Sequence, residues 1–225
     1  MQNYSDKSGS YFAHARKAIA PLLPQGTGEQ GQGARVLEIG CGAGATLGWL
    51  RQTGVASETI GIEIVDAAAT QARAFADQVH CLDFERHDLP AGHGQFDVIL
   101  CLDVLEHMVD PWTIVDRLVT GYLKPGGTLV ASLPNIQHYS VVLPLLFKGK
   151  WRYENEGLLD RTHLRFFTRE SALALMTHAS LKQPRCVVPG FGWRSRKGGL
   201  NALTGGILAG LLTYQYYLAA VKKDE

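Results

Sequence analysis

Glu38 and three glycines at alternate positions, Gly40, Gly42 and Gly44, are the residues of this 225-residue chain whose types and spacing are best suited to chemistry. An apolar run precedes them, and the segment 45–52 that follows is predicted to be a helix. Glycine has no Cβ, so a ligand can approach the backbone of such a loop closely. The first free N–H groups of the helix would also point at the loop. The block therefore predicts a ligand-binding turn after a buried strand.

The charge of Glu38 distinguishes two classes of ligand. Gly40, Gly42 and Ala45 satisfy the dinucleotide pattern G-x-G-x-x-G/A. However, a carboxylate two residues before the first glycine would repel a pyrophosphate. It suits a ligand that carries an ammonium and a sulfonium, as S-adenosylmethionine (SAM) does.

A second carboxylate supports a nucleotide ligand of either class. Glu63 lies near the end of the apolar, β-branched run 59–64, nineteen positions after Gly44. An acid about 20 residues past the glycines typically accepts hydrogen bonds from a ribose. We therefore expect Glu63 to bind the ribose.

The order of these blocks resembles the class I SAM-dependent methyltransferases. E-x-G-x-G-x-G at 38–44 is similar to the first motif of that family, and FDVI at 96–99 and LKPGG at 123–127 are similar to later ones. The resemblance implies SAM as cofactor and S-adenosylhomocysteine (SAH) as product. The residues that it assigns to the cofactor site are Glu38, Gly40, Cys41, Gly42, Gly44, Glu63, Ile64, Asp83, Phe84 and Leu102. Of these, Asp83 and Phe84 would face the adenine.

Strands and helices are expected to alternate up to about residue 132, which predicts an α/β fold with a parallel sheet. The resemblance implies a single domain over 1–225 with a Rossmann-like sheet of seven mostly parallel strands, an antiparallel last hairpin strand and helices on both faces. We expect a helix at 10–24 to cap the cofactor cleft. We expect 134–167 to form an insertion or lid that binds the acceptor, with an apolar helix at 141–147. The segment 214–221 should be the antiparallel strand.

Methyl transfer requires alignment of the acceptor with the methyl group, and removal of a proton if the acceptor is a hydroxyl. Asp103, Glu106 and His107 are spaced i, i+3 and i+4, so on one helical turn they would share a face at the mouth of the cleft. The candidate catalytic residues are Asp103 and three histidines that could act as a general base, His107, His138 and His163. Positioning without any base is the alternative.

The block DVLEH at 103–107 is similar to two kinds of relatives, the ubiquinone-pathway O-methyltransferases and the small-RNA 3′-end 2′-O-methyltransferases. In both, an acid-x-x-Glu-His run binds a divalent cation. The resemblance would give this role to Asp103, Glu106 and His107, with His138 as a fourth ligand. Aspartate at the first position shortens the reach, so we do not favour a metal.

Two later blocks indicate the acceptor. SLPN at 132–135 and GLLDRTHLRFFT at 157–168 are similar to bacterial methyltransferases associated with cell-surface polysaccharide synthesis. This implies O-methylation of a hydroxyl on a small molecule or a glycan. Three alternatives are a metal-assisted RNA 2′-O-methyltransferase, an NAD-dependent oxidoreductase and a non-catalytic SAM-binding protein. Only 161–169 and 185–197 are markedly basic, so nucleic acid is not a strong candidate.

The composition excludes few other classes. A net charge of +1 gives no general case for nucleic acid or membrane binding. The four cysteines have neither metal-site nor disulfide spacing, which favours reduced thiols and a cytoplasmic protein: Cys41, Cys81, Cys101 and Cys186. The segment 198–221 has no charged residue, but its polar residues favour a short helix and a strand over a membrane anchor. Membrane contact through 198–221 and the choice between monomer and homodimer stay open.

Overall fold

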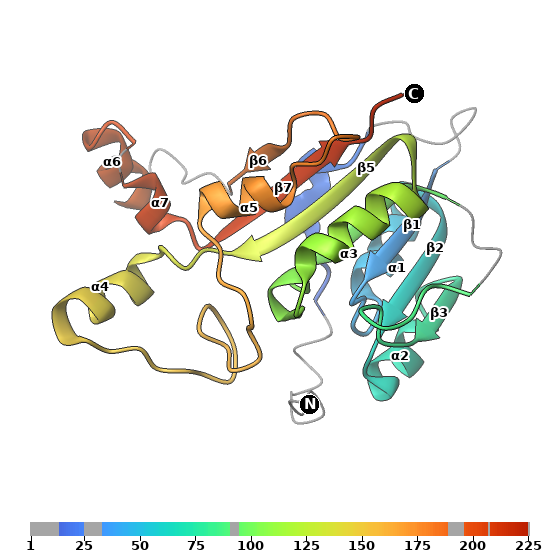
Figure 1. The fold of residues 1–225 in the computed structure, drawn as a ribbon, viewed down its shortest axis with the longest axis horizontal. Coiled ribbons are helices and arrows are strands. Elements are labelled where there is room, and N and C mark those ends of the chain that lie inside the picture. The colour runs from blue at the N-terminus through green and yellow to red at the C-terminus, as the bar shows by residue number, and fades with distance from the viewer. Residues whose placement is uncertain (1–13, 25–32, 91–94, 189–195, 207, 225) are drawn as a thin grey trace.

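The computed structural model describes residues 14–24, 33–90, 95–188, 196–206 and 208–224 (Figure 1). Its described strands form one sheet in the order β3-β2-β1-β4-β5-β7-β6. The strands are β1 (Ala34–Ile39), β2 (Ala56–Glu63), β3 (Gln78–Cys81), β4 (Phe96–Leu102), β5 (Leu123–Pro134), β6 (Arg185–Val187) and β7 (Gln215–Val221). Strands β1 to β5 pair in parallel, whereas β7 is antiparallel to β5 and β6 is antiparallel to β7. This confirms the predicted Rossmann-like fold.

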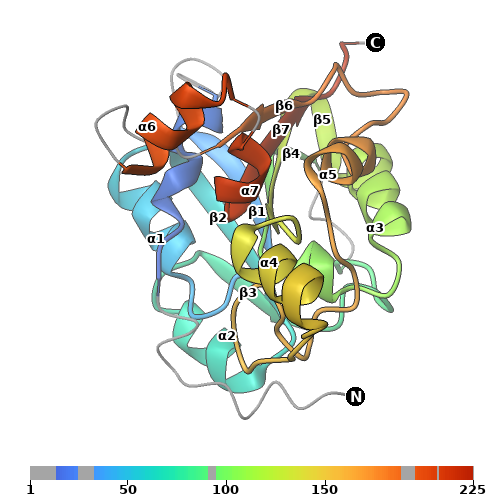
Figure 2. The same ribbon diagram turned by 90° about the vertical axis from the view of Figure 1, so that its left-hand side faces the viewer.

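Helices cover both faces of the sheet (Figures 1 and 2). Two apolar clusters, one on each face, hold them in place. One cluster joins the sheet to the 3-10 helix η3 (Lys17–Leu22), to α1 (Ala45–Gln52) and to the end of α2 (Asp66–Ala72). The other joins it to α3 (Pro111–Arg117), the π-helical turn η6 (Leu118–Tyr122) and α5 (Arg169–Leu175). Because β1 and β4 are covered on both sides, their residues are almost all buried.

The predicted helix at 10–24 is wrong in type and extent within the described residues. Residues 10–13 lie outside them, and η3 is a six-residue 3-10 helix that contains Pro21. Proline has no N–H and its ring clashes with the preceding turn, so a regular α-helix is not sustained here. Ile19 and Leu22 still bury their side chains against the sheet.

The segment after β5 forms α4 (Tyr139–Lys148), as predicted, followed by a loop that returns to α5. The C-terminal segment forms α6 (Arg196–Leu203) and α7 (Ala209–Leu212) and then enters the sheet as β7, which confirms the predicted helix and strand. The side chain of Asn135 fastens the two segments together by donating to the carbonyls of Gly210 and Thr213, each at 2.7 Å. No helix among the described residues is long and apolar enough to cross a bilayer.

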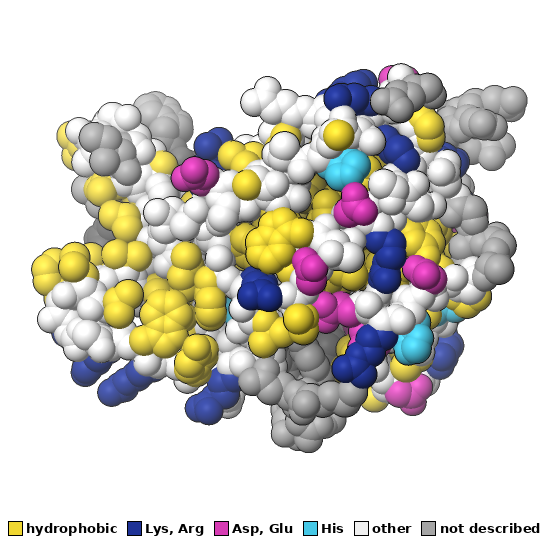
Figure 3. All heavy atoms as spheres, in the orientation of Figure 1, with side chains coloured by type: hydrophobic (Ala, Val, Ile, Leu, Met, Phe, Trp, Pro, Cys, Tyr) yellow, Lys and Arg dark blue, Asp and Glu magenta, His cyan; other side chains and the backbone are white. Residues whose placement is uncertain are grey.

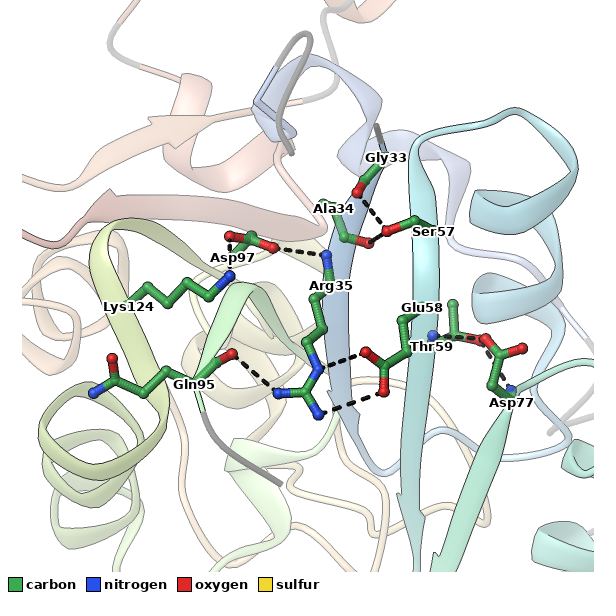
Figure 4. A network of polar contacts seen from close by, with 10 residues as sticks. All are labelled: Gly33, Ala34, Arg35, Ser57, Glu58, Thr59, Asp77, Gln95, Asp97 and Lys124. Atoms are coloured by element: carbon green, nitrogen blue, oxygen red, sulfur yellow. Dashed lines mark hydrogen bonds and ion pairs between the residues drawn. The ribbon is translucent and has the colours of Figure 1, made fainter. Parts of the chain in front are cut away.

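A polar network joins the amino ends of the central strands, far from the ends that bind ligands in such sheets (Figure 4). The guanidinium of Arg35 on β1 donates to Glu58 on β2 and to the carbonyl of Gln95 before β4. Asp97 on β4 accepts from the backbone of Arg35 and from Lys124 on β5, each at 2.8 Å. The network joins four strands at their amino ends, so their carboxyl ends are free of it and can bind a ligand.

Candidate functional site

A pocket of about 200 Å³ opens at the carboxyl ends of β1, β2 and β4. Nine of the ten residues predicted to bind a cofactor line it: Glu38, Gly40, Cys41, Gly42, Glu63, Ile64, Asp83, Phe84 and Leu102. The tenth, Gly44, does not line the pocket. Its φ is 82° at the N-cap of α1, and a Cβ there would lie 2.9 Å from the Cα of Ala72. Gly44 is therefore required for the turn and for close packing against α2.

The glycine loop is tied to the end of β2. The backbone N–H groups of Gly40 and Cys41 both donate to the carbonyl of Ile62, at 2.8 and 3.0 Å. Glu63, only 5% exposed, accepts from the N–H of Gly42 and from that of Val65, each at 2.9 Å. Burial raises the pKa of Glu63 and these N–H groups oppose the rise. Glu63 thus anchors the loop, a role that the sequence analysis missed, and its two oxygens retain acceptor capacity towards the pocket.

Glu38 is a buried acid with an unsatisfied oxygen that lines the pocket. Its side chain is 3% exposed, and Oε2 has no hydrogen-bond partner among the described residues. Burial raises the pKa of Glu38 to about 8, although Arg16 and Thr46 lower it in part. At neutral pH the carboxyl is therefore mostly protonated, and a ligand cation would favour its ionised form.

Asp83 and Phe84 also lie at the pocket. The carboxylate of Asp83 accepts from the N–H of Glu85 at 3.0 Å. The Phe84 ring is 3% exposed and is covered on one side by the guanidinium of Arg117, 4.2 Å from the ring centroid. Their predicted contact with an adenine stays a prediction.

Asp103 lines the pocket and has an unusual backbone. Its φ of 54° is the only positive value at a non-glycine residue in the described part of the chain. Its carboxylate pairs with Arg16 at 2.7 Å and accepts hydrogen bonds from Ser132 on β5 and Gln215 on β7. Arg16 was not predicted from the sequence, because its contact with Asp103 joins residues that are far apart in the chain.

The predicted common face of Asp103, Glu106 and His107 is wrong. Asp103 has a left-handed backbone and only Leu105–His107 form a 3-10 turn, so Asp103 does not share one helical turn with Glu106 and His107. Asp103 and His107 line the pocket, whereas Glu106 points inward, 2% exposed. Burial raises the pKa of Glu106 well above its usual value. Its Oε2 has no partner among the described residues.

The structure separates the other candidate histidines. His163, 9% exposed, lies with Nε2 4.0 Å from Glu106 and with its ring edge-on to that of His107, at a centroid distance of 4.7 Å. Glu106, His107 and His163 form a group whose potential metal-ligating atoms all lie within 4.8 Å of one another. His138 caps α4 through Ser140 and does not line the pocket. The predicted ligand set is thus corrected: within the described residues His163 joins the group, and Asp103 and His138 lie outside it.

The hydrogen bonds of His107 define its tautomer. Nδ1 lies 3.1 Å from both the carbonyl oxygen and the hydroxyl oxygen of Thr162. That hydroxyl donates its hydrogen to the buried carboxylate of Asp160 at 2.7 Å, so both oxygens beside Nδ1 act as acceptors. Nδ1 must then carry the proton, which leaves the lone pair of the neutral imidazole on Nε2.

The 134–167 insertion is hydrogen-bonded to the turn Leu105–His107. The backbone N–H groups of Leu164 and Arg165 donate to the carbonyl of Glu106, at 2.8 and 3.0 Å. No residue of 134–167 lines the pocket as the structure describes it. The insertion therefore positions His107, and its predicted role in binding the acceptor stays a prediction.

A family described as a methyltransferase domain matches residues 11–182. The ubiquinone biosynthesis O-methyltransferase of Acinetobacter baylyi is 30% identical over 109 residues, which are 46% of this chain and 44% of the relative. The chain thus matches less than half the length of this curated relative.

Two solved structures share the fold. A SAM-dependent methyltransferase from Archaeoglobus fulgidus has a TM-score of 0.62 at 18% identity, covering 99% of this chain and 97% of its own. The plantazolicin methyltransferase BpumL, solved in complex with SAH, has a TM-score of 0.59 at 18% identity. The match covers 98% of this chain and 87% of BpumL.

Proposed function

We propose that this chain, which belongs to the methyltransferase-domain family, uses SAM to methylate a hydroxyl group of a small-molecule or glycan acceptor. The observation that carries the proposal is the oriented imidazole of His107 at the pocket. The name of the A. baylyi relative, an O-methyltransferase, supports the same reaction type. Family membership argues against an NAD-dependent oxidoreductase.

In the proposed reaction an oxygen lone pair of the acceptor attacks the methyl carbon, and the carbon–sulfur bond breaks. The sulfonium becomes the neutral thioether of SAH, and the hydroxyl proton passes to Nε2 of His107. The sulfonium is already a good leaving group, so the protein contributes alignment and removal of the proton. Asp160 and Thr162 would hold the imidazole in the required tautomer.

We place SAM across the ends of β1, β2 and β3. Its ammonium would meet Glu38, its ribose hydroxyls Glu63, and its adenine Asp83 and Phe84. The methyl group would then face the turn that carries His107. The partly filled acceptor capacity of Glu63 and the unsatisfied oxygen of Glu38 support this orientation.

Replacement of Glu63 by alanine should weaken SAH binding by about 1–3 kcal/mol, or roughly 5- to 150-fold, because the ribose loses hydrogen bonds to a charged group. Isothermal titration calorimetry measures the affinity. Glu63→Gln keeps one oxygen for the loop and should weaken binding less. Glu58→Ala is the matched control, since Glu58 lies at the opposite end of β2 and pairs with Arg35. An unchanged affinity in both Glu63 variants would exclude this pose.

The group of Glu106, His107 and His163 offers a second way to activate a hydroxyl. One carboxylate and two imidazoles suit a divalent transition metal, and the unsatisfied Oε2 of Glu106 fits a ligand role. A metal bound there would polarise the acceptor oxygen. We favour the metal-free base, and chelation separates the two, as described in the Discussion.

The proposed reaction is tested directly with methyl-labelled SAM and matched acceptors that carry a hydroxyl, an amine or a thiol on the same sugar or phenolic scaffold. We expect label on the hydroxyl acceptors. Transfer restricted to amines or thiols would contradict O-methylation. Transfer to a small RNA assayed in parallel, with none to these acceptors, would favour the nucleic-acid alternative. A cytoplasmic location also stays a prediction, which the four free cysteines favour.

A further inference from the structure

Helix α4 presents an apolar surface that nothing in the described structure covers. Of its ten residues only Val141 is buried. Leu146 is 69% exposed and Phe147 74%, and Leu143 and Leu145 are 42% and 45% exposed. Soluble helices normally bury such side chains, and exposed apolar clusters mark interaction surfaces.

The C-terminal helices extend this surface. Helix α7 contacts both α4 and α6, and Leu203 on α6 is 87% exposed. Figures 1 and 2 show the three helices together at one end of the molecule, beyond the sheet. In Figure 3 hydrophobic side chains gather over the same end, with basic side chains along their lower margin.

Three exposed cations lie at the C-terminal end of α4 and just after it: Lys148, Lys150 and Arg152. None of them forms an ion pair with an acid among the described residues. The sequence contains no aspartate or glutamate from Arg117 to Tyr153. Trp151 lies between the cations and packs its ring edge-on against that of Tyr153.

We propose that α4 and residues 148–153 dock the protein on the surface of a membrane that contains anionic lipids. A helix that lies at a membrane interface needs apolar side chains beside cations and aromatic rings. The apolar side chains enter the boundary of the acyl chains, and the cations meet the lipid headgroups. Charge complementarity favours this occupant over a second copy of the chain. In a symmetric pair the same patch meets itself, so its three cations would face one another.

The test is co-sedimentation of the full chain with vesicles of phosphatidylglycerol and phosphatidylcholine in equal parts, compared with phosphatidylcholine alone. We expect binding to the anionic vesicles that weakens as salt is raised, because the surface potential decays within a Debye length. Binding that is equal on both vesicles, or absent from both, would overturn the proposal.

Two variants assign the binding to this surface. Leu146→Glu with Phe147→Glu should lower the partition coefficient at least about tenfold. Lys148→Gln, Lys150→Gln and Arg152→Gln together should lower it on the order of 100-fold at low salt. The matched controls are Trp112→Glu, an exposed aromatic on α3, and the triple variant Lys17→Gln, Arg73→Gln and Arg185→Gln. Equal losses in the controls would overturn the assignment.

Two further measurements keep the result interpretable. Unchanged SAH affinity in every variant shows that the domain is folded. Light scattering determines the mass of the protein with and without the Leu146 and Phe147 substitutions. A dimer that these substitutions convert to a monomer, with vesicle binding unaltered, would assign the surface to a second copy and contradict the membrane proposal.

Discussion

Replacing His107 by alanine should lower kcat roughly 10²- to 10⁴-fold, the usual contribution of a general base. The affinity for SAH should change by less than about twofold, since the proposed role of His107 is towards the acceptor and leaves cofactor binding to other residues. His107→Gln should be equally impaired, because an amide can donate to Thr162 but has no basic lone pair. Single-turnover kinetics with a hydroxyl acceptor measure the effect.

His138→Gln is the matched control for this prediction. His138 caps α4 and does not line the pocket, so kcat should stay within about threefold of the parent value. Chelation should leave kcat of the parent protein unchanged. Loss of activity on chelation, with recovery on addition of Mn²⁺, would reassign His107 from base to metal ligand beside Glu106 and His163. Full activity in His107→Ala would remove it from both roles.

Replacing Glu38 by glutamine should weaken SAM binding roughly 30- to 1,000-fold at pH 8, the range for removing one partner of a buried charge pair. Glutamine preserves the shape of the side chain and its hydrogen-bonding capacity towards Thr46, so the loss would come from the charge. Calorimetry with SAM and SAH measures it. A change below about threefold would show that the ammonium binds elsewhere.

The same Glu38→Gln substitution should increase the stability of the ligand-free protein, although it weakens SAM binding. Burial raises the pKa of Glu38 from 4.5 to about 8. Between these two values unfolding releases a proton, so Glu38 lowers the free energy of unfolding as the pH rises through this window. Glu38→Gln removes this effect and should raise the melting temperature at pH 7 while it weakens SAM binding. The opposite signs distinguish a loss of binding from a loss of folding.

The sequence predicted the fold well where the signals are local. The strand before Gly40 and the helix at 45–52 were predicted correctly because buried strands, glycine loops and helix starts depend on adjacent residues. The 10–24 helix failed because a helical pattern of apolar residues was given more weight than Pro21. The C-terminal strand was predicted correctly because its aromatic residues outweighed the apolar character of the segment before it.

The residues at the strand ends could be predicted from the sequence, whereas the contacts of residues 103–107 could not. The residues predicted to bind the cofactor lie at the ends of successive strands, so chain order implies that they meet at one edge of the sheet. The contacts of residues 103–107 are long-range: Arg16 pairs with Asp103, and Thr162 contacts His107 across 55 positions. A helical spacing rule also could not foresee the left-handed backbone of Asp103 or the burial of Glu106 away from the pocket.

The central claim is that the buried carboxylate of Glu38 is the counter-charge of the cationic cofactor. The most direct test is the number of protons released when SAH binds at pH 7, obtained by calorimetry in two buffers of different ionisation enthalpy. With a pKa of about 8 in the free protein, Glu38 must ionise to pair with the ammonium. We therefore expect release of roughly one proton per SAH in the parent protein and none in Glu38→Gln. SAH that binds with the same affinity and without proton release in both proteins would contradict the claim.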